Sequence, residues 1–160
     1  MIQLGHHLED LGIPETDVGI ASFDYGKRLL INGKNTDIKK MNQHDAVEIV
    51  DYDPLKNILM VIGTKDPCRE TPVHWIIQKA RHDINVLLQI NSRSLAEKLK
   101  GTLPTTSRET PAGTLEQAKE LLKTLREGKT VLLDNHAVLC AGVNTQEIEK
   151  TLEKIREGLK

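Results

Sequence analysis

The residue types best suited to chemistry gather in two places along the chain, around position 70 and around position 136. Glu70 and His74 lie one helical turn apart at the start of a predicted helix, so both side chains can line one pocket. A carboxylate serves as a general acid or base when burial raises its pKa toward neutrality, and histidine titrates near neutral pH. His136 stands between two apolar runs, where it can be a metal ligand or an acid within a pocket.

Each of these residues also has a purely structural interpretation. Glu70 lies beside the start of a helix, where negative charge is favoured. His74 fits at the edge of an amphipathic helix, and this interpretation is preferred because functional histidines are rare. For His136 the alternative is a partly buried side chain that holds a turn by hydrogen bonds, and the two interpretations carry equal weight.

Cysteine and the N-terminal histidines offer weaker signals. Cys68 is followed directly by Arg69, whose positive charge would lower the pKa of the thiol. The sequence alone establishes no partner for this thiol, so a nucleophilic role stays a guess. His6 and His7 are adjacent in a predicted helix at residues 2–11, where they point in different directions and cannot easily share a metal.

The composition excludes several classes of partner. The 160 residues carry 22 basic and 23 acidic side chains, a net charge of −1, so no strong field would attract nucleic acid or an anionic membrane. Aromatic residues are scarce, which argues against proteins that stack the bases of single strands. No apolar run approaches the roughly 18 residues that a membrane span needs. We therefore expect no nucleic-acid partner and no membrane partner.

Length and cysteine usage indicate the organisation and the compartment. A chain of 160 residues suits one domain, spanning residues 1–160. Cys68 and Cys140 lie far apart and form no CxxC motif, which favours a reducing compartment. The N-terminus has no apolar core of signal-peptide length. We therefore expect a cytoplasmic protein.

Hydrophobic periodicity predicts a strand-rich first half followed by alternating helices and strands. The predicted strands are 18–23, 28–31, 47–52, 58–62, 85–90, 130–133 and 138–141, and the run at 85–90 is apolar enough for a buried central strand. The predicted helices begin at a Thr71 N-cap, at Ser92, at a capping box of Thr114 with Gln117, and at Asn144. This order predicts an α/β or α+β fold built of packed layers.

Three segments, in this order, resemble the class II aldolase/adducin family. They are residues 28–51 with an acidic turn between two strands, residues 70–86 with a glutamate, a proline and a histidine, and residues 131–142 with an asparagine–histidine pair. A proline–glycine step at residues 111–114 lies before a helix, as it does in the family. The resemblance covers residues 18–158 and implies a central, mainly antiparallel sheet flanked by helices.

The resemblance implies a zinc site that this sequence does not complete. The family's aldolases use zinc as a Lewis acid, and two of its three ligands come from a His-x-His at the end of the central strand. Gln89 and Asn91 occupy those positions here, and neutral amides bind zinc far more weakly than imidazole does. Only His136 remains of the ligand set, so we expect no cofactor, with zinc conceivable only in an incomplete site. Glu70 matches the family's acid/base, but without the metal a structural role is slightly preferred.

The segments that bind the substrate phosphate in the family are altered as well. Ser22 survives from the first segment, Lys34 lies in the turn at residues 32–35, and Arg69 replaces part of a serine pair. Lys34 and Arg69 can attract a phosphate by charge, or they can be ordinary surface cations, which is the safer interpretation. Ala137 stands where the family usually has glycine, and a positive φ there would be strained.

Three hypotheses for the function follow. The leading one is a divergent class II aldolase/adducin-like protein that does not run standard zinc aldol chemistry and serves in binding or assembly. The second is a sugar-phosphate aldolase, hence a lyase, or an epimerase with a rebuilt or weak metal site that uses Glu70, His74 and His136. The third is a module that binds another small metabolite. The resemblance also implies a homo-oligomer, by analogy a tetramer, with a sugar phosphate or related metabolite as partner.

Overall fold

The computed structural model describes residues 1–10, 12, 19–134 and 136–160, and its centre is one seven-stranded sheet. Neighbouring strands are antiparallel throughout, and their order is β4-β3-β2-β1-β5-β7-β6. The strands are β1 (Gly19–Tyr25), β2 (Arg28–Asn32), β3 (Ala46–Asp53), β4 (Ile58–Ile62), β5 (Val86–Ile90), β6 (Thr130–Leu133) and β7 (Ala137–Gly142). The prediction of a central antiparallel sheet is confirmed.

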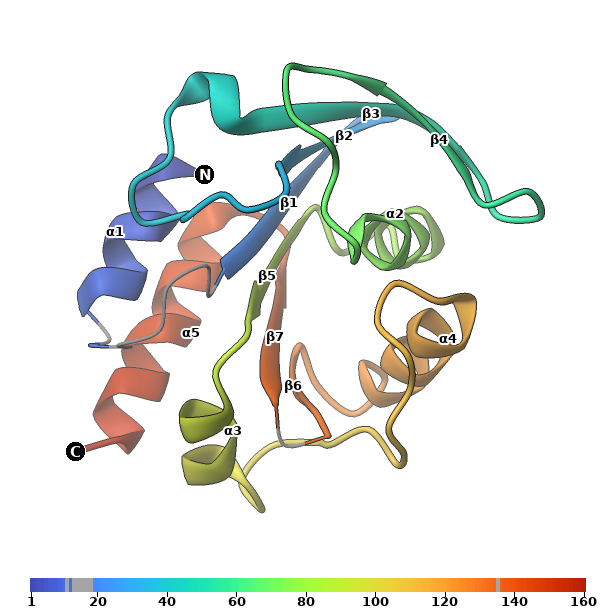
Figure 1. Cartoon of the computed structure of the whole chain (residues 1–160). Coiled ribbons are helices and arrows are strands. Elements are labelled where there is room, and N and C mark those ends of the chain that lie inside the picture. Colours follow the sequence, from blue (N-terminus) through green and yellow to red (C-terminus); the bar gives the residue numbers. More distant parts are fainter. Residues whose placement is uncertain (11, 13–18, 135) are drawn as a thin grey trace.

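Helices cover both faces of this sheet (Figure 1). They are α1 (Ile2–Asp10), α2 (Thr71–Ala80), α3 (Arg93–Leu99), α4 (Leu115–Thr124) and α5 (Thr145–Gly158), with a short 3₁₀ turn at Gln43–Asp45 that the sequence did not predict. Helices α1 and α5 lie together on one face, and α2 and α4 lie together on the other (Figure 1). The layered α/β arrangement is therefore confirmed. No helix in the described part of the chain is long and apolar enough to cross a membrane.

Strand β5 lies between β1 and β7, and each of its residues is buried. Leu88 and Ile90 enter the core that includes residues of α1 and α5, whereas Leu87 enters the core formed with α2 and α4. A strand covered on both faces needs apolar side chains at successive positions, because these point alternately to opposite faces. Burial of each such side chain contributes about 1.5–3 kcal/mol to folding.

Helix α2 begins one residue earlier in the sequence than predicted. Its N-cap is Glu70, which makes no side-chain cap bond, and Thr71 is the first helical residue. Thr71 is fully buried, and its Oγ1 lies 3.3 Å from Cys68 Sγ. The predicted Thr71 N-cap is therefore wrong, because a proline is tolerated throughout the first helical turn and does not fix the cap.

Helix α4 begins with one half of the predicted capping box. The backbone N–H of Gln117 donates to Thr114 Oγ1 at 3.2 Å, as expected. The side chain of Gln117, however, accepts from the N–H of Gly113 at 2.9 Å rather than from the N-cap residue. This bond ties the loop before α4 to the helix, and the same loop contacts the functional site described below.

The turn between β6 and β7 is strained at a different residue from the one expected. Ala137 opens β7 and does not have a positive φ, whereas Asp134 has φ of +30°. Aspartate tolerates left-handed backbone better than most residues do, because its short side chain can bond locally. Asn135 lies outside the described residues, as do Val18 and Leu11, which begin the predicted strand 18–23 and end the predicted helix 2–11.

Candidate functional site

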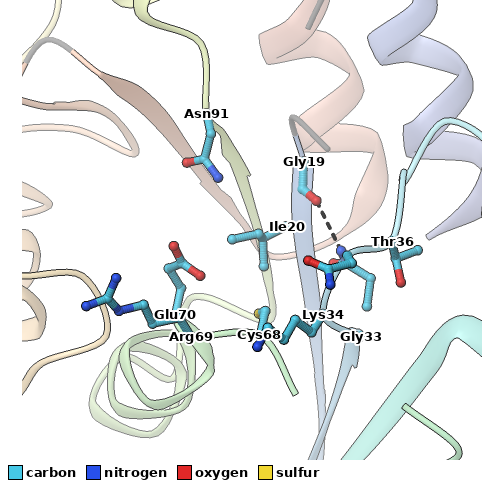
Figure 2. A pocket seen from close by; sticks show the side chains of 11 residues that line it. Gly19, Ile20, Gly33, Lys34, Thr36, Cys68, Arg69, Glu70 and Asn91 are labelled. Atoms are coloured by element: carbon cyan, nitrogen blue, oxygen red, sulfur yellow. Dashed lines mark hydrogen bonds between the residues drawn. The ribbon is translucent and has the colours of Figure 1, made fainter. Parts of the chain in front are cut away.

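A cleft of about 230 Å³ opens where β1 begins and β2 ends, beside the start of α2 (Figure 2). Its lining includes Lys34, Arg69, Glu70 and Asn91, all of them singled out from the sequence. These residues come from the loop after β2, the segment before α2 and the end of β5. With Gly19 and Ile20 also in the lining, the fold therefore brings all three altered phosphate segments together with Asn91, a position that the resemblance assigns to a metal ligand.

A buried asparagine forms the floor of this cleft. Asn32, the last residue of β2, is 2% exposed. Its Oδ1 accepts from the N–H of Ala21 at 2.8 Å, and its Nδ2 donates to the carbonyl of Gly19 at 3.1 Å (Figure 2). Backbone pairing between β1 and β2 ends at Ser22 and Ile31, so the amide continues the ladder in place of the main chain.

The loop at residues 33–36 is held against the segment that leads into α2. Gly33 forms an isolated antiparallel bridge with Pro67, and the N–H of Lys34 donates to the carbonyl of Asp66 at 2.8 Å. These contacts place Lys34 beside the segment at residues 67–70, which leads into α2. Figure 2 shows Lys34, Cys68 and Glu70 around the same hollow, with Asn91 on its far side.

The charged side chains of the cleft form no ion pair with any residue that the structure describes. Lys34 and Arg69 are exposed and Glu70 is half-buried. Nearby Lys65, in contrast, pairs with Asp45 at 2.7 Å. The two cations and the carboxylate of the cleft can therefore bind an anionic group and a hydroxyl group of one ligand.

A wider cleft of about 760 Å³ lies on the other side of Arg69. Its lining includes Arg69, Arg93, Asp134 and His136. The Nδ1 atom of His136 lies 3.3 Å from the carbonyl oxygen of Asp134, a contact in keeping with the turn-holding interpretation. Glu70 and His136 thus line neighbouring clefts that share Arg69, rather than a single pocket.

Gly113 fixes the backbone of Arg69 between the two clefts. A Cβ atom at Gly113 would lie 2.2 Å from the Arg69 carbonyl oxygen, and Gly113 has φ of +76°. Both the close approach and the left-handed backbone require glycine at this position. The loop before α4 therefore supports the segment that carries Arg69 and Glu70.

Ser22 and His74 lie beneath the cleft and do not line it. Both side chains are fully buried, and Ser22 Oγ lies 2.7 Å from His74 Nδ1 and 3.0 Å from Gln78 Oε1. Burial lowers the pKa of His74 to about 4, so the ring is neutral at pH 7. Neither side chain can meet a substrate while it is enclosed in this way, which argues against the functional interpretation of both residues and agrees with the structural interpretation preferred for His74.

Gln89 and Asn91 engage each other at the end of β5. Gln89 is 3% exposed, and its Nε2 donates to Asn91 Oδ1 at 2.9 Å. Among the residues that the structure describes, no group of three or more His, Cys, Asp or Glu side chains is placed to hold a metal ion. Zinc prefers imidazole and thiolate to neutral amide oxygens. The residues present therefore do not fit the zinc site that the resemblance implies.

Cys68 is not the activated thiol that its neighbour suggested. Burial raises the pKa of Cys68 to about 11, and a hydrogen bond with Thr71 opposes this shift only in part. The positive charge of Arg69 faces solvent instead and does not offset the loss of hydration around the sulfur. The thiol is therefore protonated at neutral pH, which corrects the expectation of a lowered pKa.

Three residues of the site had not been singled out from the sequence as part of it: Asn32, Gln78 and Gly113. Gln78 follows His74 by four positions, so both lie on the apolar face of the predicted helix. Two polar side chains on a face that is otherwise apolar were the signal that could have indicated a buried hydrogen-bond network. Asn32 ends a strand at the turn-rich stretch 32–35, which indicated a turn but not a buried amide.

Comparisons with known proteins identify the fold. No protein-family model matches the sequence, and a search of curated proteins finds no match. Among solved structures, L-fuculose 1-phosphate aldolase superposes with a TM-score of 0.80 at 18% sequence identity, over 98% of this chain and 80% of that chain.

Two bacterial proteins give similar values. L-fuculose-1-phosphate aldolase from Thermus thermophilus has a TM-score of 0.77 at 16% identity, over 98% of this chain and 87% of its own. Sugar-phosphate aldolase from Thermotoga maritima has a TM-score of 0.74 at 16% identity, over 98% of this chain and 88% of its own. The predicted class II aldolase fold is confirmed, and identities this low show the fold alone.

Proposed function

We propose that this chain, which has the class II aldolase fold, binds a small phosphorylated metabolite in the cleft beside Lys34 and does not run zinc aldol chemistry. The observation that carries the proposal is that Lys34, Arg69 and Glu70 line one cleft without an ion pair to any described residue. Two cations favour a phosphate group, and the carboxylate accepts a hydrogen bond from a ligand hydroxyl.

The size of the cleft supports a small ligand. Its volume of about 230 Å³ lies below the range of about 300–1,000 Å³ that is typical of pockets for drug-sized molecules. A phosphate joined to a few carbons suits such a space better than a nucleotide does. The solved structures that share the fold are named as aldolases of phosphorylated sugars, which favours a phosphorylated sugar or polyol by analogy.

Thermal unfolding in the presence of glycerol 3-phosphate tests this proposal. At a ligand concentration one hundred times Kd, binding stabilises the fold by about 2.7 kcal/mol, which raises the Tm of a chain of this size by roughly 5–10 °C. Glycerol at the same concentration should give no rise, because it lacks the phosphate. Inorganic phosphate should give a smaller rise than glycerol 3-phosphate, because it cannot reach Glu70 with a hydroxyl group.

Substitution of one cation separates a specific site from general attraction. Lys34→Met should remove most of the rise in Tm, because it removes a charge from the cleft while keeping the length of the side chain. Lys56→Met is the matched control, since Lys56 is an exposed lysine in the β3–β4 turn. An unchanged rise in the Lys34 variant, or no rise in the unmodified chain, would contradict the proposal.

A lyase or epimerase that acts on sugar phosphates is the second candidate. It is favoured by Glu70, which is half-buried in the cleft where the ligand would lie and forms no ion pair with a described residue. His74 is enclosed and His136 lines the neighbouring cleft, so Glu70 is the group left for proton transfer. Turnover of ketose or aldose phosphates that is abolished by Glu70→Gln would establish this activity, and no turnover by the unmodified chain would eliminate it.

Strand β4 supports the proposal of self-association. It is an edge strand of the sheet, and Ile58, Met60 and Ile62 are each more than half exposed, at 58%, 60% and 55%. An exposed, apolar edge is a template for pairing with another strand. The strand carries no charge along Ile58–Ile62, so antiparallel pairing with a second copy about a two-fold axis opposes no like charges.

A further inference from the structure

Buried polar side chains beneath the cleft form a series of hydrogen bonds whose direction can be traced. The series begins at Gln78, whose Nε2 donates to the backbone carbonyl of Asn85 at 3.0 Å and lies 3.4 Å from the carbonyl of Ser22. Backbone carbonyls only accept hydrogen bonds. The amide nitrogen of Gln78 must therefore face them, and its oxygen must face the Ser22 hydroxyl.

The direction then passes through Ser22 to His74. The Ser22 hydroxyl donates its single hydrogen to Gln78 Oε1 at 3.0 Å, so it accepts from the Nδ1–H of His74 at 2.7 Å. A neutral imidazole has one N–H group, and the other nitrogen keeps a lone pair. The Nε2 atom of His74 is consequently an acceptor, and it is buried without a hydrogen-bond partner among the described residues.

Gln89 is the polar neighbour that can supply the missing donor. Its buried side chain interacts with His74, although no hydrogen bond joins them in the orientation described. When Gln89 Nε2 donates to Asn91, its oxygen is the atom left to face His74, and two acceptors oppose each other. Rotation of both side-chain amides by 180° exchanges the oxygen and the nitrogen of each. Asn91 Nδ2 then donates to Gln89 Oε1, and Gln89 Nε2 donates to His74 Nε2.

This reversed arrangement satisfies every member of the series. Asn91, Gln89, His74, Ser22 and Gln78 then each donate to the next acceptor in this order, and the series ends at the backbone carbonyl of Asn85. Buried polar groups in native proteins are nearly always paired in this way. The reversal also has an effect at the surface, because Asn91 donates its Nδ2 to Gln89 and leaves its oxygen to the cleft.

We infer that Gln89 and Asn91 form a paired amide, oriented by His74, that presents the carbonyl oxygen of Asn91 to the ligand. This inference rests on the proposed function of the cleft. Asn91 and Glu70 both line it, so the ligand meets two acceptors there and must bring hydrogen-bond donors. The ligand is therefore a phosphorylated polyol, with hydroxyl groups beside the phosphate, rather than a phosphorylated ketone, aldehyde or acid. Gln89 is a positioning residue and Asn91 sets the specificity.

Two probes that differ by one oxidation test the inference. Glycerol 3-phosphate has a hydroxyl at its second carbon, and dihydroxyacetone phosphate has a carbonyl there. By titration calorimetry on the full chain at pH 7, the first should bind at least about tenfold more tightly, since the carbonyl leaves the half-buried acceptors of the cleft unpaired. An equal or reversed preference would overturn the inference. Failure of both probes to bind would instead refute the proposed function.

Two substitutions at Gln89 test whether this residue orients the Asn91 amide or only fills space in the core. Gln89→Leu frees the Asn91 amide to rotate, so the preference between the probes should disappear while phosphate-dependent binding persists. Gln89→Glu keeps an acceptor opposite Asn91 Nδ2, and a proton taken up between the new carboxyl group and His74 Nε2 replaces the donor that the amide supplied, so the preference should be retained. Gln146→Leu, at an exposed glutamine of α5, is the control and should change nothing. Retention of the preference in the leucine variant, or its loss in the glutamate variant alone, would overturn the inference.

A measurement on the unmodified chain does not depend on whether these variants fold. The ¹⁵N resonances of histidine distinguish which ring nitrogen carries hydrogen. For His74 we expect a protonated Nδ1 and an unprotonated Nε2, as the series from Gln78 requires. A spectrum with hydrogen on Nε2 alone would reverse the direction of the series and overturn the inference.

Discussion

The enclosed ring of His74 makes the stability of the fold depend on pH within a defined window. Its pKa is lowered from 6.5 to about 4 because burial disfavours the charged form, and the nearby Gln89 amide opposes only part of this shift. Between these values the unfolded chain binds a proton that the folded chain does not. The contribution to stability is therefore fully present above pH 6.5 and is lost as the pH falls toward 4.

The size of this effect follows from the two pKa values. Between pH 7 and pH 5 the free energy of unfolding should fall by about 2 kcal/mol, and by about 3 kcal/mol once the ring is fully titrated below pH 4. Because the side chain is fully buried, solvent does not screen this loss. For a chain of this size, about 2 kcal/mol corresponds to a fall in Tm of roughly 4–8 °C.

Urea unfolding at pH 7, 6 and 5 measures the effect when the unmodified chain is compared with His74→Gln. Glutamine does not titrate, so the unmodified chain should lose about 2 kcal/mol more than the variant over this range. Other groups with shifted pKa values, such as Asp83 and the N-terminal amine, are present in both proteins and cancel. Parallel pH profiles would refute the reasoning. If the variant does not fold, titration of the His74 ring by NMR replaces it, and a pKa near 6.5 would give the same refutation.

Three further predictions concern the glycine that supports the cleft, the edge strand and the two positions that the resemblance assigns to metal ligands. Gly113→Ala should lower the free energy of unfolding by about 1–3 kcal/mol and weaken phosphate binding, whereas Gly12→Ala, also at positive φ but in open space, should leave binding unchanged in calorimetry. If the unmodified chain self-associates as proposed, Met60→Lys should lower its mass in light scattering to that of a monomer, with little change in stability; an unchanged oligomer mass would exclude β4 as the interface. Gln89→His with Asn91→His should create near-stoichiometric zinc binding in elemental analysis, and no gain of metal would contradict the assigned ligand positions.

Much of the fold could be predicted because its signals are local. The buried positions Ile148, Leu152 and Ile155 of α5 follow the helical period that predicted this helix. The unbroken apolar run at residues 85–90 predicted the buried central strand, and only Asn85 falls outside β5. Boundaries shifted by one or two residues, as at Thr71, because several residues of a first helical turn have similar cap preferences.

The site could be predicted in part for a different reason. Lys34, Arg69, Glu70 and Asn91 were selected because their order matched a family arrangement, and they do line one cleft. The enclosure of His74 depends on its packing against Ser22, which lies 52 positions away in the sequence. No local pattern reports which side of a sheet a distant helix will cover, so burial and the resulting pKa shifts came only from the structure.

The side-chain amide of Asn32 makes the pairing of β1 with β2 independent of the residues that line the cleft. It completes the ladder between β1 and β2 with side-chain bonds, so the pairing of these two strands does not depend on the main chain at residues 33–36. The exposed side chain at position 34 can be exchanged without loss of strand pairing, provided that Asn32 and Gly33 are kept, because Gly33 packs against Lys65 and its N–H donates to the carbonyl of Asp45. The cleft is thus a place where single side chains can be exchanged to change ligand preference on an unaltered scaffold.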